Sequence, residues 1–172
     1  MALRAGDRAP AFDLPSTSGE KVSLEGLRGR KVVLFFYPKD QTPGCTREAC
    51  DFRDRYDALR AAGAEVFGIS KDSIASHGRF REKQALPYPL LSDADSAVAT
   101  AYGAFGMKTL YGKQILGTIR STFLIDEKGM IEAAWSPVKV DGHAEAVLAT
   151  LKGEAPPSEK KAASKRTTAP KG

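Results

Sequence analysis

Residues 32–37 constrain the fold most, because they form an unbroken apolar run of β-branched and aromatic residues around a single leucine. Such a run is typical of a central strand that is covered on both faces, whereas a strand with one solvent-exposed face alternates apolar and polar residues. Pro38 ends the run, and a polar loop over residues 39–43 follows it. A strand of this kind needs elements packed on both sides of its sheet, which favours an α/β domain.

Helix and strand patterns alternate along the rest of the chain. Phe52, Tyr56 and Leu59 recur at spacings of four and three residues, which predicts one long amphipathic helix that ends at Gly63. The other predicted elements are an N-terminal hairpin (12–14 and 21–24), strands at 64–70, 120–126 and 130–135, a short extended piece leading to Leu90 and Leu91, and helices at 73–84, 95–102 and 141–151.

This order of elements predicts an α/β, thioredoxin-like fold: a central mixed β-sheet flanked by helices on both faces. A parallel βαβ start, an antiparallel hairpin and a final helix make up that arrangement. The chain of 172 residues is long enough for one domain with a real core, which we assign to residues 1–152. The loop after the first central strand lies near the carboxyl ends of parallel strands, where sites concentrate in open α/β sheets.

Residues 153–172 form a basic tail with five Lys or Arg against two Glu and no large apolar residue. Such a segment cannot bury enough surface to offset the entropy of ordering, so we predict that it is disordered. A solubilising tail is the simplest interpretation, and a weak tether to nucleic acid or an anionic surface is the alternative. Residues 1–152 contain no motif specific for nucleic-acid binding. They also contain no apolar run long enough to span a membrane and no apolar stretch typical of a secretory signal, so we expect a cytoplasmic protein without membrane contact.

The chain has only two cysteines, Cys45 and Cys50, and a close pair in a protein of this composition suggests redox chemistry or a metal site. Cys45 lies in the first turn of the predicted helix, where unpaired amides and the helix dipole stabilise an anion. The thiolate is the reactive form of cysteine. Arg120 opens a predicted central strand, an unusual place for a charge, and we expect it to face Cys45.

Two loop residues complete the candidate site. The hydroxyl of Thr42 could bond a peroxide oxygen, and Pro38 could fix the course of the loop and shield the thiolate from water. Each also has a plainer interpretation. Thr42 followed by Pro43 is typical of a helix cap with proline at the first position, and Pro38 could simply end a strand.

Cys50 lies five residues after Cys45, so on an intact helix the two side chains diverge and cannot form a disulfide. If the two cysteines react, the first helical turns must unwind. Peroxide would convert Cys45 into a sulfenic acid, Cys50 would resolve it as an intramolecular disulfide, and a dithiol partner would reduce that disulfide. The alternative is that Cys50 is a small residue buried on the apolar helix face.

Residues 37–46 resemble the active-site loop of peroxiredoxins, with Pro38, Thr42 and Cys45 on its proline, threonine and peroxidatic cysteine. Residues 47–53 resemble the peroxiredoxin Q, or bacterioferritin-comigratory-protein, subfamily, in which a resolving cysteine follows five residues downstream, here Cys50. Residues 111–113 and 120–126 match further blocks, and Arg120 falls on the active-site arginine.

The resemblance implies a thioredoxin-like fold and reduction of hydrogen peroxide and organic hydroperoxides. It also implies that the protein uses no metal or bound cofactor, takes electrons from thioredoxin or a similar dithiol, and is a monomer.

Three rival functions use some of the same residues. A thiol–disulfide oxidoreductase would usually carry Cys-x-x-Cys, whereas four residues separate the cysteines here. A metal site built from both cysteines, His77 and His143 lacks the spacing of structural zinc pairs. We expect His77 to be a solvated helix residue and His143 to lie in the first turn of the last helix. A redox sensor or holdase would use the same cysteine switch without turnover.

Overall fold

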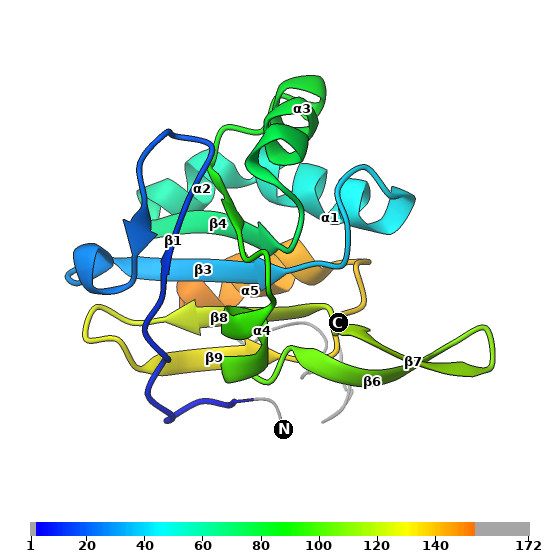
Figure 1. The fold of residues 1–172 in the computed structure, drawn as a ribbon. Helices are drawn as coiled ribbons and strands as arrows, with labels where there is room; N and C mark the ends of the chain where they lie inside the picture. The colour runs from blue at the N-terminus through cyan, green and yellow to red at the C-terminus, as the bar shows by residue number, and fades with distance from the viewer. Residues whose placement is uncertain (1–2, 154–172) are drawn as a thin grey trace, which may run out of the picture.

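The computed structural model describes residues 3–153, and its centre is a five-stranded sheet with the order β5-β4-β3-β8-β9 (Figure 1). The central strand β3 pairs in parallel with β4 and antiparallel with β8, so the sheet is mixed, as predicted. The strands are β3 (Lys31–Phe36), β4 (Ala64–Ser70), β5 (Leu90–Ser92), β8 (Ser121–Ile125) and β9 (Ile131–Trp135).

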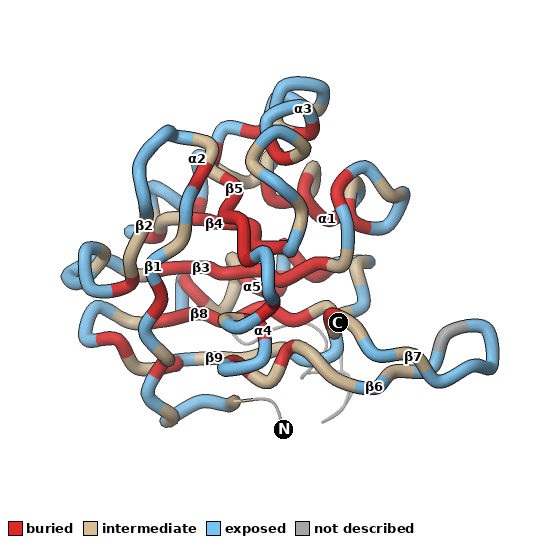
Figure 2. Tube along the Cα trace, viewed as in Figure 1, coloured by how far each residue is buried: buried red, intermediate tan, exposed pale blue. Residues whose placement is uncertain are grey.

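The run that led the sequence argument is buried on both faces. Alternate side chains of β3 enter two separate cores: Val33 and Phe35 belong to one, and Val32, Leu34 and Phe36 to the other. Figure 2 shows the middle of the sheet as the most continuously buried part of the chain. Burial on both sides is the reason why this strand has no polar alternation.

Helices cover both faces of the sheet. The core that contains Val33 also receives side chains from four helices, whereas the core that contains Val32 is closed by one short helix and the N-terminal segment. In Figure 1 that short helix, α4, and the N-terminal segment lie in front of the sheet and α5 lies behind it. The helices are α1 (Pro43–Asp54), α2 (Tyr56–Ala61), α3 (Ile74–Gln84), α4 (Ala97–Ala101) and α5 (His143–Leu151), with a 3₁₀ turn η1 (Glu25–Leu27).

The predicted long helix before Gly63 is in fact two helices. α1 ends at Asp54, and Arg55 is its C-cap. The Arg55 amide bonds the Phe52 carbonyl three residues back, and the Arg55 guanidinium bonds the Asp51 carbonyl at 3.1 Å. This side chain satisfies a carbonyl that helix termination leaves free. α2 then restarts from the Arg55 carbonyl, which accepts from the Leu59 amide. The apolar spacing continues across the break, which is why periodicity alone did not reveal it.

The sequence prediction also missed a second hairpin, β6 (Phe105–Leu110) with β7 (Lys113–Thr118), which projects from the body (Figure 1). Its two-residue turn, Tyr111 and Gly112, has positive φ at both positions, as a type I′ turn requires. Tyrosine is rare in that conformation, so the sequence of this turn gave only a weak indication of a hairpin.

The N-terminal hairpin is confirmed in a shorter form, β1 (Asp13–Leu14) with β2 (Val22–Ser23). Residues 154–172 of the predicted tail lie outside the described residues, so the domain boundary at residue 152 stays a prediction. No helix among residues 3–153 is long and apolar enough to cross a membrane.

Candidate active site

Cys45 lies in the first turn of α1, and only 2% of its surface is exposed to solvent. Thr42 is the N-cap by backbone conformation, and Pro43 occupies the first helical position, where a missing N–H costs nothing. The first helical bond runs from the Thr46 amide to the Thr42 carbonyl at 2.8 Å. Helix geometry therefore leaves the amides of Gly44 and Cys45 pointing out of the helix end, where the macrodipole is positive.

Arg120 contacts the thiol, as expected from its unusual place in the sequence. It lies immediately before β8, and its Nη2 is 3.4 Å from Cys45 Sγ, while its Nη1 donates to Glu48 Oε1 at 2.7 Å. Although burial opposes the charge, Glu48 and Cys45 raise the pKa of Arg120. A permanent cation and a helix N-terminus thus act on the same sulfur.

Glu48 is a member of this group that the sequence argument missed. It lies one helical turn after Cys45, and its side chain is 1% exposed. Burial raises the pKa of Glu48 to about 7, although Arg120 acts to lower it. Its second oxygen, Oε2, has no hydrogen-bond partner among the described residues. The sequence signal for Glu48 was its spacing of three residues from Cys45, which puts the two side chains on one face of the helix.

Gly44 has a steric reason to be glycine. A Cβ at this position would lie 3.3 Å from Arg120 Nη2, closer than a comfortable contact. The absence of a side chain therefore lets the guanidinium approach the first turn of α1.

Thr42 and Pro38 lie on the loop before α1, and both are partly buried. The Thr42 side chain does not cap the helix. Instead, Thr42 Oγ1 donates to the Lys39 carbonyl at 2.9 Å. Since the hydroxyl proton is engaged, the oxygen is free to accept a hydrogen bond from a bound molecule. Pro38 lies two residues after the end of β3, and its role as a shield of the thiol stays a prediction.

A second cation approaches the site from the β6–β7 hairpin. Lys108 Nζ donates to the Thr118 carbonyl at 2.6 Å. Burial and the nearby Arg120 lower the pKa of Lys108, and Cys45 acts in the opposite direction. The hairpin that the sequence pattern did not predict thus adds positive charge near the thiol.

Cys50 is half-buried further along α1, and both cysteines are free thiols. Its Sγ donates to Gln84 Oε1 at 3.5 Å, and burial raises the pKa of Cys50. The intervening helix is intact, which is the state in which the two side chains diverge. The structure therefore shows the folded, reduced arrangement.

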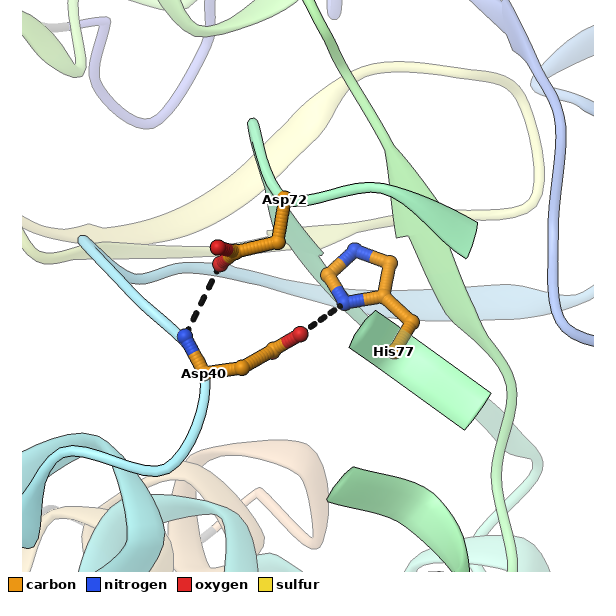
Figure 3. A group of neighbouring side chains, drawn as sticks. All are labelled: Asp40, Asp72 and His77. Atoms are coloured by element: carbon orange, nitrogen blue, oxygen red, sulfur yellow. Dashed lines mark hydrogen bonds and ion pairs between the residues drawn. The ribbon is translucent and has the colours of Figure 1, made fainter. Parts of the chain in front are cut away.

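Both histidines are buried, which overturns the prediction of a solvated His77. His77 bonds the Asp40 carboxylate and the Leu91 carbonyl, so its helix face packs against the sheet (Figure 3). His143 is in the first turn of α5, as predicted, with its Nε2 2.8 Å from Thr122 Oγ1. Burial lowers the pKa of His143 to about 4.

The rival metal set of two cysteines and two histidines is not assembled among the described residues. Within residues 3–153, the group of three or more metal-type donors that lie within 4.8 Å of one another consists of Asp40, Asp72 and His77. Neither cysteine is part of that group, and the ring nitrogens of His77 already have partners.

These contacts define what Cys45 can do. The buried Cys45 sulfur lies beside the Arg120 guanidinium and at a helix N-terminus, and both present positive charge to it. The same positive groups can stabilise an anionic oxygen that leaves after attack on a weak bond.

Comparison with known proteins gives the family. The sequence matches the AhpC/TSA family over residues 5–134. It is 52% identical to a putative peroxiredoxin bcp of Coxiella burnetii over 151 residues, covering 88% of this chain and 100% of that protein. It is 44% identical to peroxiredoxin Bcp of Bacillus subtilis over 152 residues, covering 88% and 97%.

Solved structures agree with this result. Peroxiredoxin Q of Xanthomonas campestris superposes with a TM-score of 0.81 at 44% identity, covering 87% of this chain and 97% of that chain. The bacterioferritin comigratory protein of the same organism, described for its alkyl peroxide reduction activity, gives 0.81 at 43% identity, covering 87% and 98%. Sequence and fold therefore place this chain in the AhpC/TSA family, as a peroxiredoxin of the Bcp/peroxiredoxin Q subfamily.

Proposed function

We propose that this peroxiredoxin reduces hydrogen peroxide and organic hydroperoxides through a sulfenic acid on Cys45. The observation that carries the proposal is the contact of the buried Cys45 Sγ with Arg120 Nη2 at 3.4 Å, in the first turn of α1. A relative at 43% identity is described for alkyl peroxide reduction, which supports the organic part of the substrate class.

In the proposed first step, the Cys45 thiolate attacks one oxygen of the O–O bond. The S–O bond forms as the O–O bond breaks, and the second oxygen leaves as an alkoxide or hydroxide that takes up a proton. Arg120 and the Gly44 and Cys45 amides face the charge that develops, and Thr42 Oγ1 accepts from the peroxide O–H. Cys45 loses two electrons, and the hydroperoxide becomes an alcohol or water.

Cys50 resolves the sulfenic acid in the proposed second step. Its sulfur attacks Cys45 Sγ, the S–O bond breaks, water leaves, and a disulfide forms. Cys50 follows Cys45 by five positions on the helix, so the early turns of α1 must unwind first. The contacts that hold α1 in place include those of Arg120 with Glu48, of Cys50 with Gln84, and of the Tyr88 hydroxyl with the Ala49 carbonyl at 2.6 Å.

A dithiol of the thioredoxin type then reduces the disulfide by exchange, which returns two electrons to the cysteines. The cycle needs no bound metal or cofactor, because thiols carry both electrons. We propose that the protein works as a monomer in the cytoplasm. Light scattering of the reduced and oxidised protein tests the monomer.

Stopped-flow reaction of the reduced protein with hydrogen peroxide, followed by mass spectrometry, tests this cycle. The wild type should lose both thiols to one Cys45–Cys50 disulfide, and turnover should require a thioredoxin system. The C45S variant should have no turnover. The C50S variant should complete one round of peroxide reduction and recycle poorly with thioredoxin.

Three results would count against the proposal. Substantial turnover by C45S would remove the peroxidatic role of Cys45, and unchanged turnover by C50S would remove the resolving role of Cys50. A wild-type reaction no faster than that of a free thiol would leave an exchange protein or a redox sensor instead of a peroxidase.

A further inference from the structure

Asp40 is buried, at 6% exposure, on the short loop between β3 and α1, and it is held from several directions. Its Oδ1 accepts from the Tyr37 hydroxyl at 2.6 Å, and its Oδ2 accepts from Ser76 Oγ at 2.8 Å and contacts His77 Nδ1 at 2.7 Å. Its backbone amide donates to Asp72 Oδ2 at 2.8 Å. Figure 3 shows the two bonds that join Asp40 to Asp72 and to His77.

His77 links Asp40 to the sheet. Its Nδ1 lies 2.7 Å from Asp40 Oδ2, and its Nε2 lies 2.9 Å from the Leu91 carbonyl. Although burial opposes ionisation, the hydrogen bonds from His77 and Tyr37 bring the pKa of Asp40 below its ordinary value. Asp40 and His77 therefore form a buried hydrogen-bonded pair.

Hydrogen bonds from neighbouring residues engage both carboxylates of the cluster. Both Asp40 oxygens accept hydrogen bonds, and Asp72 Oδ2 accepts from the Asp40 amide and from Ser70 Oγ at 2.7 Å. The cluster joins the loop before α1 to the start of α3 and to the end of β4. It therefore acts as an anchor for this loop.

The loop that Asp40 anchors is tightly wound and leads directly to Cys45. Gln41 has φ of 64°, a left-handed conformation that is unfavourable for a residue other than glycine. Such a residue persists where its surroundings over-determine the backbone. The bond from Thr42 Oγ1 to the Lys39 carbonyl closes the turn across it. α1 begins at the next residue after Thr42, so the place of Asp40 sets the place of the helix N-terminus.

We propose that the Asp40–His77 pair is a positioning device for the peroxide step, which fixes Thr42 and the first amides of α1 around Cys45. Neither side chain hydrogen-bonds to Cys45 within the described residues, so the pair acts through the loop. The inference rests on the proposed peroxidase function. It predicts that loosening the pair affects attack on peroxide, which needs Thr42 and the amides in place, more than simple alkylation of the thiol.

The D40A and D40N variants test this prediction. D40A removes the acceptors for Tyr37, Ser76 and His77. In D40N the amide oxygen still accepts from Tyr37, and the amide nitrogen can donate to Ser76 Oγ and to Nδ1 of a neutral His77 ring. We therefore expect D40N to rescue most of the positioning that D40A loses.

The measurement is the second-order rate of the reduced protein with hydrogen peroxide, compared with the rate with iodoacetamide. D40A should lower the peroxide rate by at least ~10-fold and the iodoacetamide rate by less than ~3-fold, because modest misplacement of positioning groups costs large factors in rate. D40N should stay within ~3-fold of wild type for both reagents.

The D93A variant is the matched control. Asp93 is also buried and hydrogen-bonded, through the amides of Val98 and Ala99, but it supports α4 rather than the Cys45 loop. D93A should lower the melting temperature without changing the ratio of the two rates. If D40A does not fold, the D72A variant tests the positioning role instead, because Asp72 is only partly buried. D72A removes the carboxylate oxygen that accepts from the Asp40 amide. D72N keeps an acceptor oxygen at that position and serves as its control.

Two outcomes would overturn the positioning role. One is an equal fall of both rates in D40A or D72A, and the other is a peroxide rate that neither variant changes. A wild-type protein that does not react rapidly with peroxide would instead remove the peroxidase proposal, and this inference with it. The two failures are therefore distinguishable, because only the second is seen in the wild type.

Discussion

Replacing Glu48 with Gln should make the protein less sensitive to rising pH. Glu48 is 1% exposed, and its pKa is raised from 4.5 to about 7 because burial outweighs the attraction of Arg120. The unfolded chain releases this proton near its ordinary pKa, whereas the folded chain keeps it to about pH 7. Folding therefore takes up a proton in this window, and the wild type loses stability as the pH rises through it.

The size of the effect follows from the two pKa values. A difference of ~2.5 pKa units, at about 1.36 kcal/mol each, corresponds to about 3 kcal/mol of stability that is lost above the folded pKa. A neutral Gln at position 48 has no proton to release. The free energy of unfolding of E48Q minus that of the wild type should therefore rise by about 3 kcal/mol between about pH 4 and pH 8.

Urea unfolding of both reduced proteins across this range measures the difference, with fluorescence of the single tryptophan, Trp135, as the probe. Taking the difference between variants cancels the titrations that they share. The E25Q variant, at an exposed glutamate, controls for the loss of one negative charge. A difference between E48Q and wild type that does not change with pH would refute the reasoning, since Glu48 would then ionise as an ordinary carboxylate beside Arg120.

Three further predictions concern the thiol, the sheet and the helix that must unwind. R120K keeps the charge but cannot donate from two separated nitrogens, so the stopped-flow rate with hydrogen peroxide should fall by ~10-fold or more. G68A places a Cβ 2.8 Å from Phe35 Cζ, and this overpacking should cost about 1–3 kcal/mol in urea unfolding. Y88F removes the hydrogen bond to the Ala49 carbonyl, so α1 should unwind more easily. Disulfide formation after peroxide addition, followed by quenching and mass spectrometry, should therefore be faster than in the wild type. Slower disulfide formation would contradict this prediction.

Several features of the fold could be predicted because their signals are local. The apolar run at 32–37 indicated a strand covered on both faces, and the two cores confirm it. The proline at position 43 indicated a helix start, which put Cys45 in the first turn of α1. Arg120 was predicted to face Cys45 because a charge at the start of a central strand needs a partner, and Nη2 lies 3.4 Å from the sulfur.

Other features of the fold could not be predicted from the local sequence. The break at Arg55 leaves the apolar periodicity intact, so the pattern continued through it. The β6–β7 turn uses a tyrosine at positive φ, against the usual preference for glycine, asparagine or aspartate. In both places the backbone departs from what the residue types favour, and tertiary contacts determine the outcome.

The sequence by itself determined the central strand, the helix start and the place of Cys45 in the first helical turn, because these depend on residues close together in the chain. Only the tertiary structure decided the environment of the charged groups. Glu48 meets Arg120 across 72 residues, and Asp40 meets His77 across 37. On a single helix, Glu48 and His77 look like ordinary surface residues. Their burial depends on what the sheet and the loops bring against them, and that placement sets the charge and hydrogen bonds around the thiol.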